Sequence, residues 1–509
     1  MRESITLAVG TIVVALAAAG CPGVPHTVQG GPPVLTGGPG ATSTCKPILL
    51  QAGVDVDGYV SDRYSWSDGA CRPRSAALVR NDRTDPGGTS GGFLRRYAYE
   101  SGGRTRTCDG GAPGVDWYGW GYVVSHYGSD GDAATSRRRK GTWRTVLAGR
   151  HHAIHEFKVR VFPGGPVDVT VQWMFATGRS NPVVAITHDA SAAGPDAVSA
   201  DARAPYGHLN FDGDGTGMGP VGGLGWGDRY RFFTTGTGAG GGVDFQSPWD
   251  YSQPNLVPHV LMWSSDVDAE MGAVQTQTFE EHVGGGDYGG GALARCWGAT
   301  SATKPAECGL LSTDWLWPFQ LNQYEIPFSN WSKRLAWGLS GGSVGRASVT
   351  AFGRTYTGYP FQSYSVHVVL GRHSDRPTEA QVAEVVAQRR ADFSASVGAV
   401  PSRGPAGVGR SDEAPYVPAG LDPVWGTWTV RAAGQAAAVR LAPAPGSPLV
   451  NPLLRVLGWT GAAPPAQVIL GGVGLVPDVD YYASVDPAEK TLWITLGRTV
   501  TAAVELTLR

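Results

Sequence analysis

The chain has 509 residues, a length typical of two or three domains, and a formal net charge of −2 at pH 7. This near-neutral balance excludes nucleic acid as the expected partner, because nucleic-acid-binding proteins carry a basic patch. The 74 glycines, 36 prolines and 17 tryptophans favour a protein rich in strands and turns, since Gly and Pro suit turns and aromatic side chains suit strands.

The first segment of the chain, 1–21, is typical of a secretory signal. Arg2 precedes an apolar run that ends at Ala19, and small residues lead to Cys21. The ending Ala-Ala-Gly-Cys resembles a bacterial lipoprotein signal, in which the cysteine is lipidated, although Ala18 stands where leucine is commonest. We therefore expect an exported protein that is lipid-anchored at the bacterial cell envelope through Cys21 or, after ordinary cleavage behind Ala19, secreted.

The cysteines that follow the signal fit an exported chain, in which disulfides form readily. Cys296 and Cys308 flank a short loop and are expected to pair. Cys71 is expected to pair with Cys108, which leaves Cys45 over unless it displaces one of them. No Cys-x-x-Cys spacing occurs in the sequence, which argues against a structural zinc site.

Composition divides the rest of the chain into segments. A flexible Pro/Gly-rich tether (22–43) precedes a large domain (44–398), in which short strand patterns are separated by turn residues. A linker (399–423) then leads to a small C-terminal module (424–509). Strands without alternating helices predict an all-β fold: a large antiparallel β-sandwich with one late helix, plus a C-terminal Ig-like β-sandwich.

The late helix is predicted from a capping box and an apolar stripe. Thr378 is the expected N-cap and Gln381 completes the box. Val382, Val385 and Val386 form the stripe that would face the core.

Three histidines begin a predicted hairpin whose second strand is Val167–Phe175. In an extended segment His151 and His155 share the apolar face, while His152 and Glu156 share the polar face. A pair four residues apart on a strand is separated by roughly 13 Å, too far to hold one ion. His155 is therefore a candidate catalytic residue, and His151 and His152 are candidate substrate contacts. The alternative is that all three are hydrogen-bonded sheet residues.

Acidic residues supply the other catalytic candidates. An extended segment would place Asp266, Asp268 and Glu270 on one face, where repulsion should raise at least one pKa. Such a pair of carboxylates is what a glycosidase uses as acid and nucleophile. A solvated strand face or a cation site is the alternative. Asp228, in a Gly-rich stretch, is a further candidate acid.

A second dense patch suits an acidic sugar. Arg203, with Tyr206 and His208, would hold a uronate carboxylate and move protons, and Arg179 is a further candidate for binding the carboxylate. Many loops have this composition by chance.

Two Gly-rich stretches complete the candidate sites. Asp212 and Asp214 alternate with glycine as in part of a calcium loop, which makes calcium the one candidate cofactor, although a tight solvated turn is the favoured explanation. Trp226 and Arg229 are candidate substrate contacts, because an exposed Trp would stack on a sugar ring. The alternative for Trp226 is a place in the core.

These residues together predict a secreted carbohydrate-active enzyme that cleaves glycosidic bonds of an extracellular polysaccharide. A hydrolase with two acids is slightly favoured, and a polysaccharide lyase with His, Tyr and Arg chemistry is the alternative. A surface lipoprotein that binds glycan without catalysis, as in adhesion, is the alternative from another class.

Overall fold

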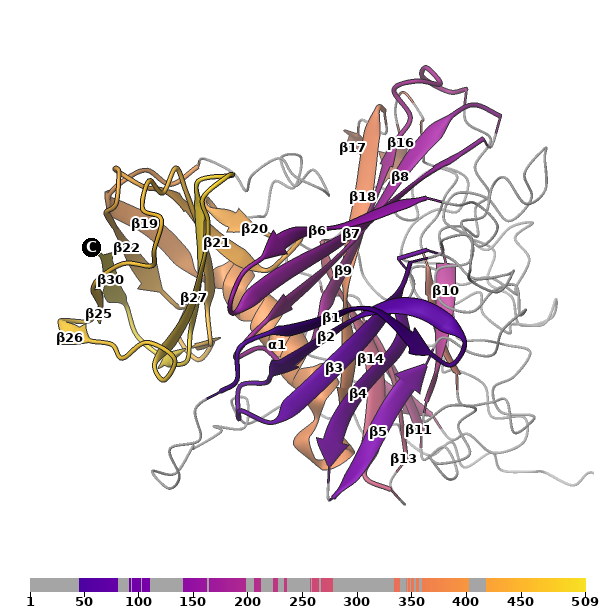
Figure 1. The fold of residues 1–509 in the computed structure, drawn as a ribbon, viewed down its shortest axis with the longest axis horizontal. Coiled ribbons are helices and arrows are strands. Elements are labelled where there is room, and N and C mark those ends of the chain that lie inside the picture. Colours follow the sequence, from indigo (N-terminus) through magenta and orange to yellow (C-terminus); the bar gives the residue numbers. More distant parts are fainter. Residues whose placement is uncertain are drawn as a thin grey trace, which may run out of the picture.

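The computed structural model describes most of the residues in the N-terminal and C-terminal parts of the chain, and isolated strands between them. The described residues are 45–80, 91–92, 94–101, 103–109, 141–162, 164–197, 206–211, 223–227, 233–235, 257, 259–264, 267–277, 334–338, 345, 347, 349–351, 354–356, 359–401 and 418–509. Over these residues the chain is mostly β-strand, in several largely antiparallel sheets with a single α-helix (Figure 1). The all-β expectation is confirmed at this level. The expected signal and tether, Cys21 included, lie outside the described residues.

The first sheet is built mainly from the N-terminal hairpins. It has seven strands in the order β1-β2-β3-β4-β5-β10-β15, all antiparallel to their neighbours. They are Leu49–Val56 (β1), Tyr59–Ser67 (β2), Pro73–Val79 (β3), Leu94–Ser101 (β4), Arg104–Asp109 (β5), Tyr206–Phe211 (β10) and Arg334–Gly338 (β15).

The second sheet has nine strands in the order β12-β11-β13-β14-β18-β9-β8-β7-β6. They are Phe233–Thr235 (β12), Gly223–Gly227 (β11), His259–Ser264 (β13), Ala269–Gln277 (β14), Phe361–Gly371 (β18), Val183–Asp189 (β9), Val167–Ala176 (β8), His152–Val161 (β7) and Thr142–Ala148 (β6). The predicted hairpin of β7 and β8 is confirmed, with Val161 opposite Val167 across the Pro-Gly-Gly-Pro turn. A separate two-stranded hairpin joins Val349–Ala351 (β16) to Arg354–Tyr356 (β17).

Aromatic side chains join the two sheets. Tyr64 of β2 stacks on Phe175 of β8, with ring centroids 4.8 Å apart, and Trp66 lies 5.1 Å from the same ring. The indole N–H of Trp173 donates to the carbonyl of Gly92 at 2.7 Å. Because side chains alternate along a strand, Trp173 and Phe175 lie on one face of β8, which is the face that contacts the first sheet.

The helix α1 (Pro377–Arg390) follows a short 3-10 turn (His373–Asp375, η7) and packs on the second sheet. Its predicted stripe is confirmed, because the three valines of α1 form a buried cluster with two valines of the second sheet and with Val257, which lies just before β13. The cluster is Val382, Val385, Val386, Val257, Val274 and Val369.

The predicted N-cap of α1 is wrong. The cap is Arg376, in a left-handed conformation with φ 49°, and Pro377 starts the helix. Thr378 therefore lies inside the first turn, and its backbone N–H donates to the carboxylate of Glu270, 3.0 Å away. A carboxylate from a distant strand thus replaces the local side-chain cap that the capping box predicted.

The strand that directly follows α1 pairs with a strand of the C-terminal module expected over 424–509. Strand β19 (Asp392–Val397) leaves the helix and pairs with β22 (Ala437–Ala442) in a five-stranded sheet of order β19-β22-β30-β25-β26. The other strands of this sheet are Val504–Leu508 (β30), Val468–Leu470 (β25) and Val473–Gly474 (β26). Residues 402–417, most of the expected linker, lie outside the described part of the chain.

A second five-stranded sheet of the module has the order β20-β21-β24-β28-β27. Its strands are Leu421–Asp422 (β20), Thr427–Arg431 (β21), Leu453–Leu457 (β24), Thr491–Leu496 (β28) and Tyr481–Asp486 (β27), and a short pair joins Leu449–Val450 (β23) to Thr499–Val500 (β29). Strands β21 and β24 are parallel, while the other pairs of this sheet are antiparallel.

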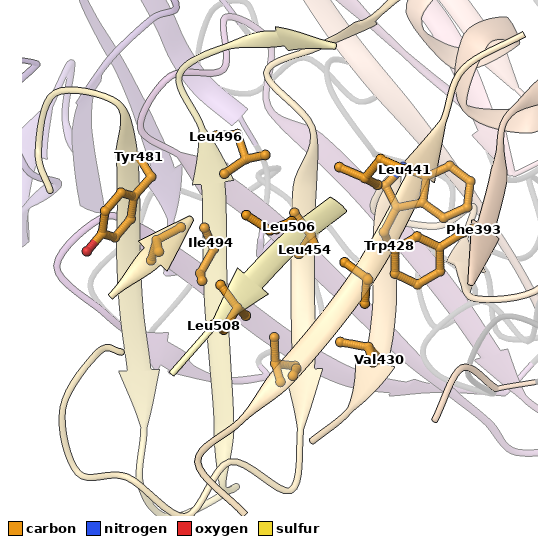
Figure 2. Close-up of a cluster of buried hydrophobic side chains, with 14 of the residues drawn as sticks. Phe393, Trp428, Val430, Leu441, Leu454, Tyr481, Ile494, Leu496, Leu506 and Leu508 are labelled. Carbon is orange, nitrogen blue, oxygen red and sulfur yellow. The ribbon is translucent and has the colours of Figure 1, made fainter. Parts of the chain in front are cut away.

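One apolar cluster joins the two sheets of the module (Figure 2). Trp428 is fully buried and its ring lies 4.9 Å from that of Phe393, which comes from β19. Leu441 and Leu454 approach from opposite sheets. The strand that follows α1 therefore supplies part of this core, because Phe393 is one of its members.

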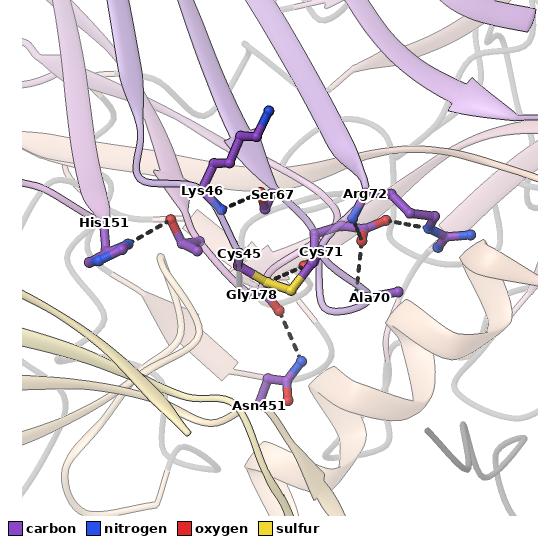
Figure 3. The surroundings of a disulfide bond; sticks show 11 residues. Cys45, Lys46, Ser67, Ala70, Cys71, Arg72, His151, Gly178 and Asn451 are labelled. Atoms are coloured by element: carbon purple, nitrogen blue, oxygen red, sulfur yellow. Dashed lines mark hydrogen bonds and ion pairs between the residues drawn. A yellow bond between two sulfur atoms is a disulfide. The ribbon is translucent and has the colours of Figure 1, made fainter. Parts of the chain in front are cut away.

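A disulfide joins Cys45 to Cys71 beside the turn between β2 and β3 (Figure 3). The expected Cys71–Cys108 pair is wrong, and Cys45 takes the place of Cys108. The backbone of Cys108 lies in β5, two strands and roughly 10 Å from β3, which follows Cys71. That separation exceeds the roughly 7 Å that a disulfide spans between Cα atoms. Cys296 and Cys308 lie outside the described residues.

Removing this bond should destabilise the protein. The Cys45→Ser/Cys71→Ser variant is expected to lose about 3 kcal/mol of unfolding free energy in urea, because the bond closes a loop with a sequence separation of 26. Cys108→Ser is the control and should unfold as the wild type does. A comparable loss in Cys108→Ser, or a Cys71–Cys108 peptide in non-reducing digests, would contradict the pairing.

Candidate functional site

The segment that carries the predicted acids is a turn followed by a strand. Strand β13 ends at Ser264 and β14 begins at Ala269, so Asp268 lies in the turn, with φ 46°. The segment is therefore not one extended strand, because the backbone turns at Val267–Asp268, before β14 begins. Asp266 lies outside the described residues.

Asp268 holds this turn against the segment that follows β18. Its carboxylate accepts hydrogen bonds from the Ser374 backbone N–H at 2.7 Å, the Ser374 hydroxyl at 2.8 Å and the Arg372 Nε at 3.0 Å. Burial disfavours the charge, but these bonds from Ser374 and Arg372 outweigh it and lower the pKa of Asp268 below its usual value. Asp268 is therefore ionised at neutral pH and is poorly suited to donate a proton.

Glu270 is buried, with 2% of its surface exposed, and both carboxylate oxygens are engaged. Oε2 accepts a hydrogen bond from Nδ1 of His373 at 2.7 Å, and Oε1 accepts from the backbone N–H of Thr378. The strand register explains the contact between Glu270 and His373. Glu270 lies opposite Gly371, the last residue of β18, and His373 follows Gly371 by two residues. A negative charge at this point also interacts favourably with the N-terminus of α1.

His373 is the partly exposed member of this pair. In the tautomer that donates from Nδ1 to Glu270, the lone pair of the ring lies on Nε2. One third of the His373 side chain is exposed. Its ring stacks on Trp263 with centroids 4.8 Å apart and planes 6° apart. We call Glu270, His373 and Trp263 the Glu270 site.

Glu270 was among the predicted catalytic residues, whereas His373 and Trp263 were not. Trp263 is the cross-strand partner of Glu270 in the β13–β14 hairpin, so a prediction of the hairpin register would have brought it in. His373 lies in a 3-10 turn with no periodic pattern. Its only sequence signal is its position four residues before Pro377, a residue that is typical of a helix start.

His155 lies between the two large sheets rather than in the Glu270 site. Its Nδ1 is 3.3 Å from the Tyr64 hydroxyl and 3.8 Å from a carboxylate oxygen of Asp62. Complete burial, aided by the charge of Arg80, lowers the pKa of His155 to about 4. It is neutral at physiological pH, and it is fully buried, with 0% of its surface exposed to solvent.

His151 and His152 lie where the C-terminal module contacts the second sheet. His151 Nε2 is 2.8 Å from a carboxylate oxygen of Asp478, and His152 lies between the hydroxyls of Ser484 and Thr495. Both rings are buried. Strand β7 is four strands from β14, roughly 19 Å, so the histidines and the Glu270 site are not brought together.

Arg179 also links elements at this contact. Its guanidinium pairs with Glu384 of α1 and donates to the carbonyl of Asn451 at 3.2 Å. Burial outweighs the charge of Arg179 and raises the pKa of Glu384. Arg179 is thus engaged by the helix and by the module.

The remaining candidates fall outside the side chains that are described. Tyr206, His208 and Trp226 lie in β10 and β11, where the backbone alone is described. Outside the described residues lie Arg203, Asp212, Asp214, Asp228 and Arg229. Among the described residues no group of three or more His, Cys, Asp or Glu could hold a metal ion. No helix in the same part of the chain is long and apolar enough to cross a membrane.

No protein-family model matches the sequence, and a search of curated proteins finds no match.

Removing the Glu270 carboxylate should destabilise the start of α1. Glu270→Ala leaves the Thr378 N–H and the His373 ring without their acceptor, and it is expected to lose about 1–3 kcal/mol of unfolding free energy in urea. Glu270→Gln keeps an acceptor oxygen and should lose less. Exposed Glu489→Ala is the control, expected within about 0.5 kcal/mol of wild type. Equal losses in Glu270→Ala and Glu489→Ala would disprove the structural role of this carboxylate.

Proposed function

We propose that the protein is an exported carbohydrate-active enzyme that cleaves glycosidic bonds of an extracellular polysaccharide at the Glu270 site. The observation that carries the proposal is the hydrogen-bonded Glu270–His373 pair beside the Trp263 ring. A histidine oriented by a buried carboxylate is the arrangement that general bases use. A partly exposed Trp beside it offers the flat apolar face on which a sugar ring stacks.

The geometry supports elimination better than hydrolysis. Hydrolysis by two carboxylates requires both to reach the sugar, whereas Glu270 is buried with both oxygens engaged and Asp268 is held ionised. Elimination requires one base, which removes the proton on the carbon next to a uronate carboxylate. The electron pair forms a carbon–carbon double bond, the glycosidic C–O bond breaks, and the leaving oxygen takes a proton from water. His373 Nε2 is the proposed base.

The same proposal assigns a role to Arg372. Its side chain is 45% exposed and it is adjacent to His373 in the chain, so it would pair with the uronate carboxylate of the substrate. Asp268, which accepts from the Arg372 Nε, would orient the guanidinium. The substrate class is therefore an acidic polysaccharide.

Export and the finer fold are part of this proposal. The Cys45–Cys71 bond supports an oxidising compartment, in which a secreted or Cys21-anchored envelope protein would fold. We also infer that the two large sheets form a β-sandwich and that the C-terminal module is Ig-like, on the support of the aromatic contacts between the large sheets and the common core of the module.

A second candidate function, glycan binding without catalysis, is favoured by one observation. The described side chains first considered as catalytic or substrate-binding are largely engaged by other protein groups, as the buried His151, His152 and Arg179 illustrate. A binding protein needs only the exposed part of the Trp263–His373 stack.

The test is turnover on a panel of neutral and acidic polysaccharides, followed by new reducing ends and by ultraviolet absorbance of the unsaturated product. We expect both signals to rise on an acidic polysaccharide. His373→Ala should lower kcat by about 10²-fold or more, the range for a general base. Arg160→Gln is the control, because Arg160 is an exposed residue of the same sheet, paired with Asp168.

The other outcomes separate the alternatives. Reducing ends without absorbance would show hydrolysis and disprove elimination. Cleavage unaffected by His373→Ala would move the site elsewhere. Binding without cleavage across the panel, weakened by Trp263→Ala, would establish the binding function instead.

A further inference from the structure

The C-terminal module covers one face of the second large sheet. Apolar side chains of β6–β9 and of the module form one buried cluster. Its members are Leu147, Ile154, Met174, Val183, Ala185, Val424, Trp425, Leu453 and Trp493. The face of β7 that was predicted to be polar, with His152 and Ile154, is thus the face on which the module docks.

His152 is the polar centre of this contact. Its ring is 0% exposed, with Nδ1 3.0 Å from the Ser484 hydroxyl and Nε2 2.9 Å from the Thr495 hydroxyl. Ser484 also accepts the backbone N–H of His151 at 2.8 Å. Both partners of His152 are neutral hydroxyls from β27 and β28, so the ring reaches across the contact without meeting a negative charge.

His151 lies at the edge of the same contact and is surrounded differently. Its ring is close to Asp478, to the Thr177 hydroxyl at 3.2 Å and to the Arg150 Nε at 3.1 Å. It also lies beside the ring of Tyr482, 5.4 Å away. Asp478 would compensate a charge on His151, which the partners of His152 cannot do.

We propose that docking of the C-terminal module is acid-sensitive, and that a proton on His152 releases the module from the second large sheet.

The sign follows from burial. Released into water, His152 has the ordinary histidine pKa of about 6.5. In the docked protein, burial and then the charge of His151 hold the pKa of His152 well below that value. The contribution of His152 to docking is therefore complete above pH 6.5, and it falls by up to about tenfold per pH unit below 6.5 until the docked-state pKa of His152 is reached.

Other ionisable groups face this contact. Arg150 and Arg455, the latter over the Trp493 ring, add positive charge, while Asp478 alone favours a protonated His151. Burial lowers the pKa of His151, so it acts in the same direction as His152. Tyr482 stays neutral in this range because its burial raises its pKa. Asp480 is paired with Arg498.

Three buried groups lie further along the contact. Glu384 opposes His152, because burial outweighs its pair with Arg179 and raises its pKa, so acid relieves a buried charge and favours the docked state. His367, whose pKa burial lowers to about 3, acts in the same direction as His152 wherever release exposes it to water. Asp422 acts in the opposite direction, because burial raises its pKa to about 7 and acid relieves its charge. His152 remains the group with no compensating partner.

The test is small-angle X-ray scattering of the purified protein between pH 8 and pH 4.5, with circular dichroism to confirm that the strands persist. We expect the radius of gyration to increase reversibly as the pH falls below 6.5. His152→Gln keeps a donor and an acceptor but cannot take up the proton, so it should stay compact to a lower pH. His151→Gln is the matched control and should still expand.

A second readout keeps the proposal testable if His152→Gln does not fold. The His151 amide donates across the contact to Ser484, so its hydrogen exchange reports docking directly in the wild type. Corrected for intrinsic rates, its protection should fall with pH before that of the Trp428 amide in the module core. An unchanged radius down to pH 4.5, an equal transition in His152→Gln, or simultaneous loss of both amides would overturn the proposal.

Discussion

The architecture around the candidate site depends on the hydrogen bonds that satisfy the buried carboxyl group of Glu270. Glu270 is an acid on a central strand of the second large sheet, and a buried carboxylate is tolerated only when its oxygens are satisfied. Its partners come from the 3-10 turn and from the first turn of α1. These hydrogen bonds therefore hold the end of β18, the ring of His373 and the start of α1 in fixed positions relative to one another.

The sequence predicted those elements whose signal is local. The β7–β8 hairpin follows from alternation around Pro-Gly-Gly-Pro, and the buried stripe of α1 from the spacing of its valines. The helix start was misjudged because Thr378 receives its acceptor from Glu270, more than a hundred residues earlier in the chain. Local capping rules cannot detect a cap supplied by another strand.

The candidate site shows the same limit. Glu270 was found because acids in a β-rich segment are conspicuous, but its assignment assumed an extended strand where the chain turns at Asp268. His151 and His152 were conspicuous too, yet a second layer covers them, and the sequence of one strand does not reveal what packs on its outer face. His373 carried no pattern at all. Sequence chemistry thus identified the residue types, whereas tertiary contacts decided which of them meet.

The position of the disulfide has a mechanical consequence. Strand β1 is the edge of its sheet, and Cys45 precedes it by only a few residues. Without the bond, a pull on the chain ahead of Cys45 would peel β1 from β2 one hydrogen bond at a time. With the bond, the load passes through the sulfurs into the turn before β3, and β1 carries no tension. Any object to which the N-terminal segment is attached therefore pulls on the interior of the sheet rather than on its weakest strand.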